Sequence, residues 1–204
     1  MKRNTAMTPP FRNPVLWLRR FRKRCGYGVH SPFAFGFITE VVYEDLPYYA
    51  FDGLDAGLGF WQRFRVKRYL HLLFRLTNFE HPERIVFFDV PEMERRYVCA
   101  ACPGAVVEDW GEGNSAEEKS LGKIDGKVQK NTDGSAQKTL FVLGRPNDEV
   151  LQHLQSDSML VLSNVHLYKE WWDGLPKVLG FDLYDVGVTF FNKKYNKQDY
   201  VVNF

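Results

Sequence analysis

The chain has 204 residues, of which 45% are hydrophobic and 25% are charged, and its formal net charge is +2. This length and a composition close to the globular average predict one ordinary folded domain and exclude a chain that is disordered throughout. No apolar run approaches the roughly 20 residues that a transmembrane helix needs.

The charge is distributed unevenly. Residues 1–24 hold eight of the 27 basic side chains and no acid, which leaves 19 bases against 25 acids, or −6, over the rest of the chain. A mildly acidic body excludes a basic nucleic-acid footprint over the whole domain. Helical spacing over Pro14–Phe21 predicts a short basic amphipathic helix. Residues 14–24 could contact an anionic membrane or RNA, or dock on the body with their arginines facing water.

The cysteines are few. Cys25, Cys99 and Cys102 form an odd and sparse set, which does not suggest a disulfide framework. Cys99 and Cys102 have redox spacing, but they close a predicted helix and no second pair is present, so we expect no metal site. The four apolar residues of Val15–Leu18 are too few for a signal peptide, and we expect a cytoplasmic protein.

The first part of the chain is predicted to be helical. Ser31 suits a helix N-cap and Pro32 suits the first helical position, so a helix is expected to run to about Tyr43. The glycine-containing stretch 52–59 predicts a loop, and apolar residues at helical spacing predict a helix over 60–78.

The second part alternates strands with helices. Apolar runs predict buried strands at 85–88, 105–107, 139–143 and 159–162. Helices are predicted between them at 92–101, 148–155 and 168–179. The chain is expected to close with a β-hairpin of 183–191 and 199–202. This alternation predicts an α/β fold with a mostly parallel sheet.

The predicted organisation has two parts. Residues 1–79 form a basic tail and an N-terminal helical cap, and residues 80–204 form the α/β domain. Within that domain, residues 111–138 are polar and rich in glycine, which predicts a flexible loop.

Three motifs carry a resemblance to a known family: Gly28-Val29-His30-Ser31-Pro32-Phe33, Asp55-Ala56-Gly57-Leu58-Gly59 and Ser163-Asn164-Val165-His166-Leu167. With them the chain resembles a bacterial family of class I S-adenosylmethionine (SAM) dependent methyltransferase-like proteins. The resemblance implies a Rossmann-like sheet with a C-terminal antiparallel β-hairpin, and SAM as the cofactor.

The chain departs from this family where the cofactor would bind. The family has a glycine-rich turn after the first core strand, whereas this chain has Asp89-Val90-Pro91-Glu92-Met93-Glu94. Without glycine the backbone cannot approach the cofactor as closely, and proline removes a backbone donor. The carboxylates of Glu92 and Glu94 would repel the carboxylate of SAM, because both carry negative charge. The segment after Glu108 also lacks the helices and strand that the family fits there.

The resemblance still assigns candidate site residues. The cofactor-binding candidates are Asp89, Glu108, Asp109 and Asn164, and the catalytic candidate is His166. An acid at the end of the second strand can accept hydrogen bonds from ribose hydroxyls. His166 follows a strand's carboxyl end, where open α/β sheets place ligands, and there it can act as a general base. The alternatives are solvated strand-end acids and an ordinary loop histidine.

Three functions follow from these patterns. The first is a methyltransferase-like protein with a degenerate cofactor loop, acting as a non-catalytic binding or regulatory relic. The second is an active, divergent SAM-dependent methyltransferase. The third is a membrane- or RNA-associated scaffold that uses residues 14–24. The 17 phenylalanines and the Trp171-Trp172 pair leave room for an apolar interface with a protein partner or in a homodimer.

Overall fold

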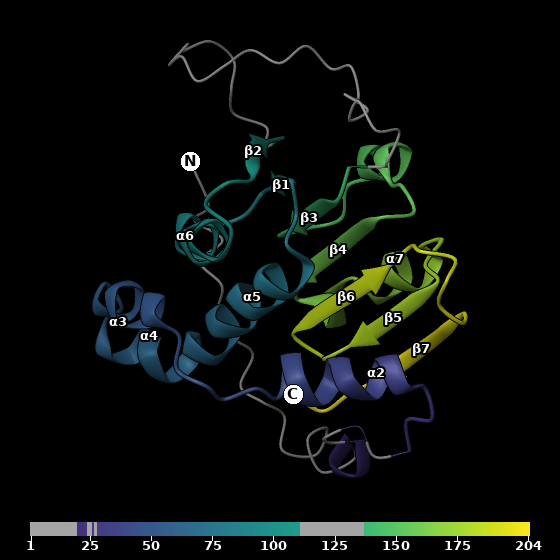
Figure 1. Ribbon diagram of the computed structural model, residues 1–204, viewed down its shortest axis with the longest axis horizontal. Helices are drawn as coiled ribbons and strands as arrows, with labels where there is room; N and C mark the ends of the chain where they lie inside the picture. Colours follow the sequence, from purple (N-terminus) through teal and green to yellow (C-terminus); the bar gives the residue numbers. More distant parts are fainter. Residues whose placement is uncertain (1–19, 24–25, 27, 111–136) are drawn as a thin grey trace.

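The computed structural model describes residues 20–23, 26, 28–110 and 137–204, which form a seven-stranded sheet with helices on both faces (Figure 1). The predicted basic helix over 14–21 and the predicted loop over 111–138 lie almost entirely outside the described residues. Arg20 and the short 3-10 turn Phe21–Lys23 are the described end of the basic segment.

The strands are β1 (Arg84–Phe88), β2 (Val106–Asp109), β3 (Thr139–Leu143), β4 (Ser158–Ser163), β5 (Leu179–Asp182), β6 (Val186–Phe190) and β7 (Gln198–Val201). Their order across the sheet is β2-β1-β3-β4-β6-β5-β7. Strands β1 to β4 are mutually parallel, and β6 is antiparallel to both β4 and β5. The predicted α/β class, with a mostly parallel sheet that ends in an antiparallel hairpin, is therefore confirmed.

The hairpin uses different strands from those predicted. β6 pairs with β5. The first residue of β5, Leu179, falls at the end of the helix predicted over 168–179. That helix is shorter, α7 (Lys169–Gly174). β7 pairs in parallel with β5 instead of joining β6. The reason is that β6 already has β4 on one edge and β5 on the other, so the last strand can add only to the open edge of β5.

The N-terminal helix begins as the sequence predicts. α2 (Pro32–Phe37) starts with Pro32, and the Ser31 hydroxyl accepts a hydrogen bond from the backbone N–H of Ala34 at 3.3 Å. A π-helical turn continues α2 to Val42. The buried Arg75 side chain donates to the carbonyl oxygens of Val41 and Val42 at 2.8 and 2.9 Å, so the buried end of this helix is satisfied.

Two further helices differ from the sequence prediction. Most of the stretch predicted as a glycine loop belongs to α3 (Tyr49–Ala56), because Asp55 is held inside the helical layer by side chains from other helices. The helix predicted over 60–78 is divided at Val66 into α4 (Phe60–Arg65) and α5 (Lys67–Glu80).

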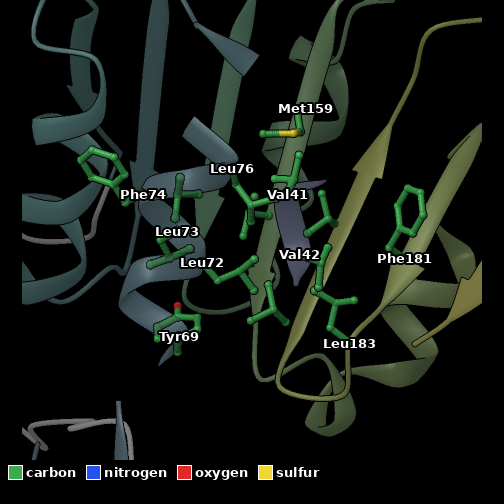
Figure 2. Packing of buried hydrophobic residues seen from close by; sticks show 14 of the residues in the cluster. Val41, Val42, Tyr69, Leu72, Leu73, Phe74, Leu76, Met159, Phe181 and Leu183 are labelled. Carbon is green, nitrogen blue, oxygen red and sulfur yellow. The ribbon is translucent and has the colours of Figure 1, made fainter. Parts of the chain in front are cut away.

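The core has two parts, one on each face of the sheet. Residues of β1 alternate between them, with Ile85 and Phe87 on one face and Val86 and Phe88 on the other. The first face is covered by α2, α5 and α6 (Glu92–Ala101). Figure 2 shows the side chains of α5 within this first cluster. The second face packs on α7.

The second face depends on a close approach between a helix and a strand. Trp172 of α7 is fully buried, and a Cβ added at Gly187 of β6 would lie 2.7 Å from its ring. The strand therefore needs glycine at this position.

Among the helices that the structure describes, none combines the length and the apolar content needed to cross a bilayer.

Candidate functional site

The carboxyl ends of the parallel strands are the place where open α/β sheets bind ligands, at the point where the strand order reverses. Here the chain passes from β1 to β2 on one side and then returns to β3 on the other side of β1. The reversal therefore lies between the ends of β1 and β3, which we call the switch point. Its residues are Phe88, Asp89, Leu143, Gly144 and Arg145.

The chain's own atoms bridge the switch point. Gly144 donates its backbone N–H to the carbonyl oxygen of Phe88 at 2.9 Å, and a Cβ on Gly144 would collide with the Asp89 carbonyl. The Arg145 guanidinium forms an ion pair with Asp89 at 3.1 Å and lies 5.2 Å from the centre of the Phe88 ring. Asp89 adopts a left-handed conformation, with φ of 53°. SAM would meet this glycine-free turn and would have to displace the ion pair, whose two side chains are each nearly half exposed.

A buried polar network lies beside this edge. The Tyr69 hydroxyl from α5 donates to the Glu94 carboxylate from α6 at 2.6 Å, and it lies 2.6 Å from the Ser163 hydroxyl at the end of β4. All three residues are buried, and Glu94 is only 3% exposed. We call this set the Tyr69–Glu94–Ser163 network. Elements far apart in the sequence thus meet through direct polar contacts.

The network holds a carboxyl group that titrates near neutral pH. Burial raises the pKa of Glu94 from 4.5 to about 7, although hydrogen bonds with Tyr69 and Ser163 act in the opposite direction. Burial and the neighbouring Glu94 also raise the pKa of Tyr69 well above its usual range. With Glu94 ionised, Tyr69 donates to it and Ser163 donates to Tyr69, since one hydroxyl carries one proton.

The catalytic candidate His166 lies in a 3-10 turn just after β4. Its Nδ1 is 3.1 Å from the carbonyl oxygen of Tyr184, and its ring stacks on the Tyr184 ring at 4.6 Å between centroids. Because a carbonyl only accepts, this contact requires the proton on Nδ1. The carboxylate of Asp185 lies 3.9 Å from the same nitrogen. His166 is thus oriented toward the turn between β5 and β6.

The candidate Asn164 has a backbone role in the structure. It adopts a left-handed conformation, with φ of 55°, and its N–H donates to the carbonyl oxygen of Asp185 at 2.5 Å. Asparagine tolerates this conformation better than most residues do. The residue thereby turns the chain out of β4 and brings His166 against the turn between β5 and β6.

The two strand-end acids of β2 are both bound to arginines. Arg84 donates two hydrogen bonds to Glu108, at 2.8 and 2.5 Å, and this contact holds the pKa of Glu108 below its usual range. Asp109 pairs with Arg95 at 2.5 Å. Since β1 and β3 lie between β2 and β4, these acids stand roughly 14 Å from the strand that leads to His166. The predicted site residues therefore do not form one cluster.

The residues that the sequence reasoning missed are those of the Tyr69–Glu94–Ser163 network. Tyr69 lies within the helix predicted over 60–78, where its apolar ring suggests only packing, and the sequence shows Glu94 only as a charge that repels SAM. One signal was present in the pattern of α6. Glu94 lies three and four residues before Tyr97 and Val98, which are buried, so it shares their helix face. A glutamate on a buried face marks a group that needs partners.

A second polar cluster joins the helices of the N-terminal part. The Asp55 carboxylate accepts hydrogen bonds from the Tyr97 hydroxyl at 2.6 Å and from Lys67 at 2.8 Å, and it lies 3.0 Å from Nε2 of His71. Burial favours a raised pKa for Asp55, but these three partners together lower it. This Asp55 cluster connects α3 to α5 and α6, which accounts for the helix at a stretch predicted to be a loop.

The described end of the basic N-terminal segment is docked on the body. The Arg20 guanidinium donates to both oxygens of the buried Asp182, at 3.1 and 3.4 Å, and lies 5.2 Å from the centre of the Tyr184 ring. Burial opposes ionisation of Asp182, yet Arg20 brings its pKa below the usual value. The docking alternative had the arginines facing water, whereas Arg20 is the residue that contacts the body and Phe21 is 47% exposed. Residues 14–19 lie outside the described part of the chain.

Comparisons with known proteins add no relative. No family model matches the chain, no curated protein matches its sequence, and no solved structure matches its fold. Within the described ranges, no group of three or more histidine, cysteine, aspartate and glutamate side chains is placed to hold a metal ion.

Proposed function

We propose that this protein is a non-catalytic binding or regulatory protein built on a methyltransferase-like α/β fold. The observation that carries the proposal is the glycine-free switch point, which is bridged by the chain's own side chains. Arg145 pairs with Asp89, and Gly144 packs against the Asp89 carbonyl, in the place where a Rossmann-like sheet binds its nucleotide. A cofactor would have to displace both an ion pair and a backbone contact.

The surrounding chain supports this proposal. A mostly parallel sheet that ends in an antiparallel pair agrees with the family resemblance. The first turn of α6 carries Glu92 and Glu94, and carboxylates at a helix N-terminus take the position that favours an anionic ligand. Glu108, the ribose-binding candidate, is already bound by Arg84. The three acids Asp89, Glu108 and Asp109 each have an arginine partner.

The experiment is calorimetric titration of the full chain with SAM and with S-adenosylhomocysteine. We expect no heat of binding up to about millimolar ligand, which corresponds to about −4 kcal/mol. A methyltransferase that binds SAM is the positive control. Micromolar binding by the wild type would contradict the proposal. In that case Glu108→Ala, with the exposed Glu149→Ala as its matched control, shows whether the strand-end acid holds the ribose.

The second candidate function is an active enzyme, and the Tyr69–Glu94–Ser163 network favours it. A carboxyl group with a pKa near 7 is suited to acid–base work, and it lies beside the edge where ligands bind. This candidate replaces the first if the wild type transfers methyl groups from SAM to components of a cell extract. Glu94→Gln should then slow transfer without weakening SAM binding, whereas Glu149→Gln should change neither.

A further inference from the structure

Two neighbouring aromatic side chains of α4 are largely exposed. Phe60 is 67% exposed and Trp61 is 74% exposed, and their rings meet edge to face with centroids 5.6 Å apart. The helix that carries them is held at its start by the Gln62 side chain, which accepts the backbone N–H of Gly59 at 2.9 Å. The two rings are therefore presented by an ordered helical turn.

The aromatic pair is accompanied by basic side chains. Residues 57–79 contain no acid, and Arg63, Lys67 and Arg68 are exposed along α4 and the first turn of α5. Arg96 of α6 is also exposed, and its guanidinium approaches Gly57. We call Phe60, Trp61 and these four cations the aromatic–basic patch. It is positively charged on a body that is otherwise mildly acidic.

The acids placed around the patch are Asp52 and Asp55 of α3 and Glu92, which lies one helical turn before Arg96 on α6. Asp55 is buried and accepts from Lys67 at 2.8 Å and from Tyr97, so its charge is largely compensated. Asp52 is exposed on the same helix. Arg63 donates to the backbone carbonyl of Asp55 at 3.2 Å, and a carbonyl leaves the guanidinium's charge in place. With Lys67 paired to Asp55, the three arginines Arg63, Arg68 and Arg96 face the two exposed acids Asp52 and Glu92, which leaves a small excess of positive charge.

The position of the patch leaves it accessible from outside the fold. Figure 1 shows α3 and α4 at the end of the molecule opposite β5 and β7, projecting beyond the sheet. A projecting end can meet a flat surface without interference from the sheet.

We propose that the aromatic–basic patch docks on an anionic lipid bilayer. Tryptophan and phenylalanine side chains partition into the headgroup region, and each nearby lysine or arginine is attracted by anionic lipid. Single-stranded nucleic acid also uses aromatic and basic groups, but it stacks bases on open ring faces. The edge-to-face contact of Phe60 with Trp61 directs one ring's edge at the other's face, which disfavours a continuous stacking platform. The docking is independent of whether SAM binds.

The test is cosedimentation of the full chain with vesicles. One set is phosphatidylcholine alone, and the other contains roughly 30% phosphatidylserine. We expect binding to the anionic vesicles only, weakened by high salt. Phe60→Ser combined with Trp61→Ser, and separately Arg63→Glu, should each weaken it by roughly tenfold or more. Leu167→Ser is the matched control, because Leu167 is 66% exposed on another part of the surface, and it should bind as the wild type does.

Three outcomes would overturn the proposal. The first is absence of binding to anionic vesicles. The second is binding that the α4 variants leave unchanged; if Arg12→Gln combined with Arg19→Gln then abolishes it, the contact belongs to the N-terminal tail. The third is tighter binding of a single-stranded RNA oligonucleotide that the same α4 variants abolish. Circular dichroism of each variant shows that the fold is kept.

Discussion

Replacing Glu94 with glutamine tests the buried network directly. Glutamine has nearly the shape of glutamate, and its amide can accept from Tyr69 and donate to Ser163. The variant therefore keeps the packing and both contacts at 2.6 Å around Tyr69, while it removes the group that must ionise in a buried site.

The magnitude follows from the pKa of Glu94, which folding raises from 4.5 to about 7. The folded protein holds this proton longer than the unfolded chain does, so the free energy of unfolding falls as the pH rises from about 4.5 to about 7. Each pKa unit corresponds to about 1.4 kcal/mol, so the loss from this one group is about 3 kcal/mol, complete above about pH 7. Glutamine does not titrate, and the variant should not show this loss.

The assay is urea denaturation followed by tryptophan fluorescence at about pH 5 and at about pH 8. Relative to the wild type, Glu94→Gln should gain roughly 2–3 kcal/mol of unfolding free energy between the two pH values. Comparing the two proteins at each pH cancels the groups that they share, and Glu149→Gln on the exposed surface should show no such gain. A difference between variant and wild type that is the same at both pH values, or that falls with pH, would refute the reasoning.

Two further predictions concern local packing and capping. Gly187→Ala places a Cβ 2.7 Å from the Trp172 ring and should lower the free energy of unfolding by about 1–3 kcal/mol in urea denaturation. Gly174→Ala is its control, because no atom outside its own helical turn and its chain neighbours lies within 4 Å of the new Cβ, and an equal loss there would contradict the packing argument. Ser31→Ala removes the side-chain cap of α2 and should cost about 1 kcal/mol in thermal unfolding, whereas Ser31→Thr should retain most of it. Equal stability of the alanine and threonine variants would show that the cap does not act.

Some of the architecture could be predicted because it depends on local pattern. A continuous apolar run such as 139–143 predicts a buried strand wherever it pairs, and β3 occupies those residues. Ser31 and Pro32 predict the start of α2, because capping involves only the next few backbone groups. The mostly parallel α/β class follows from the alternation of such segments along the chain.

The errors occurred where partners distant in sequence decide the outcome. The stretch 52–59 contains three glycines, which predict a loop. In the structure α3 extends to Ala56, because Asp55 is held by Tyr97 and other side chains of the helical layer. The sequence predicts that the last strand pairs with β6, but both edges of β6 are already occupied by β4 and β5. Local propensity carries no information about which edge of a sheet is occupied.

The candidate site likewise has one feature that the local sequence predicts and others that depend on residues distant in the chain. The sequence by itself determined that the turn after β1 lacks glycine and carries acids, and thereby that a cofactor would meet an unsuitable turn. Only the tertiary structure decided that Arg145 and Gly144 close that turn from β3, and that Glu94 meets Tyr69 and Ser163 inside the protein. The physical reason is that burial and partner choice depend on the folded neighbours of a group, and it is burial in the folded protein that raises the pKa of Glu94 to about 7.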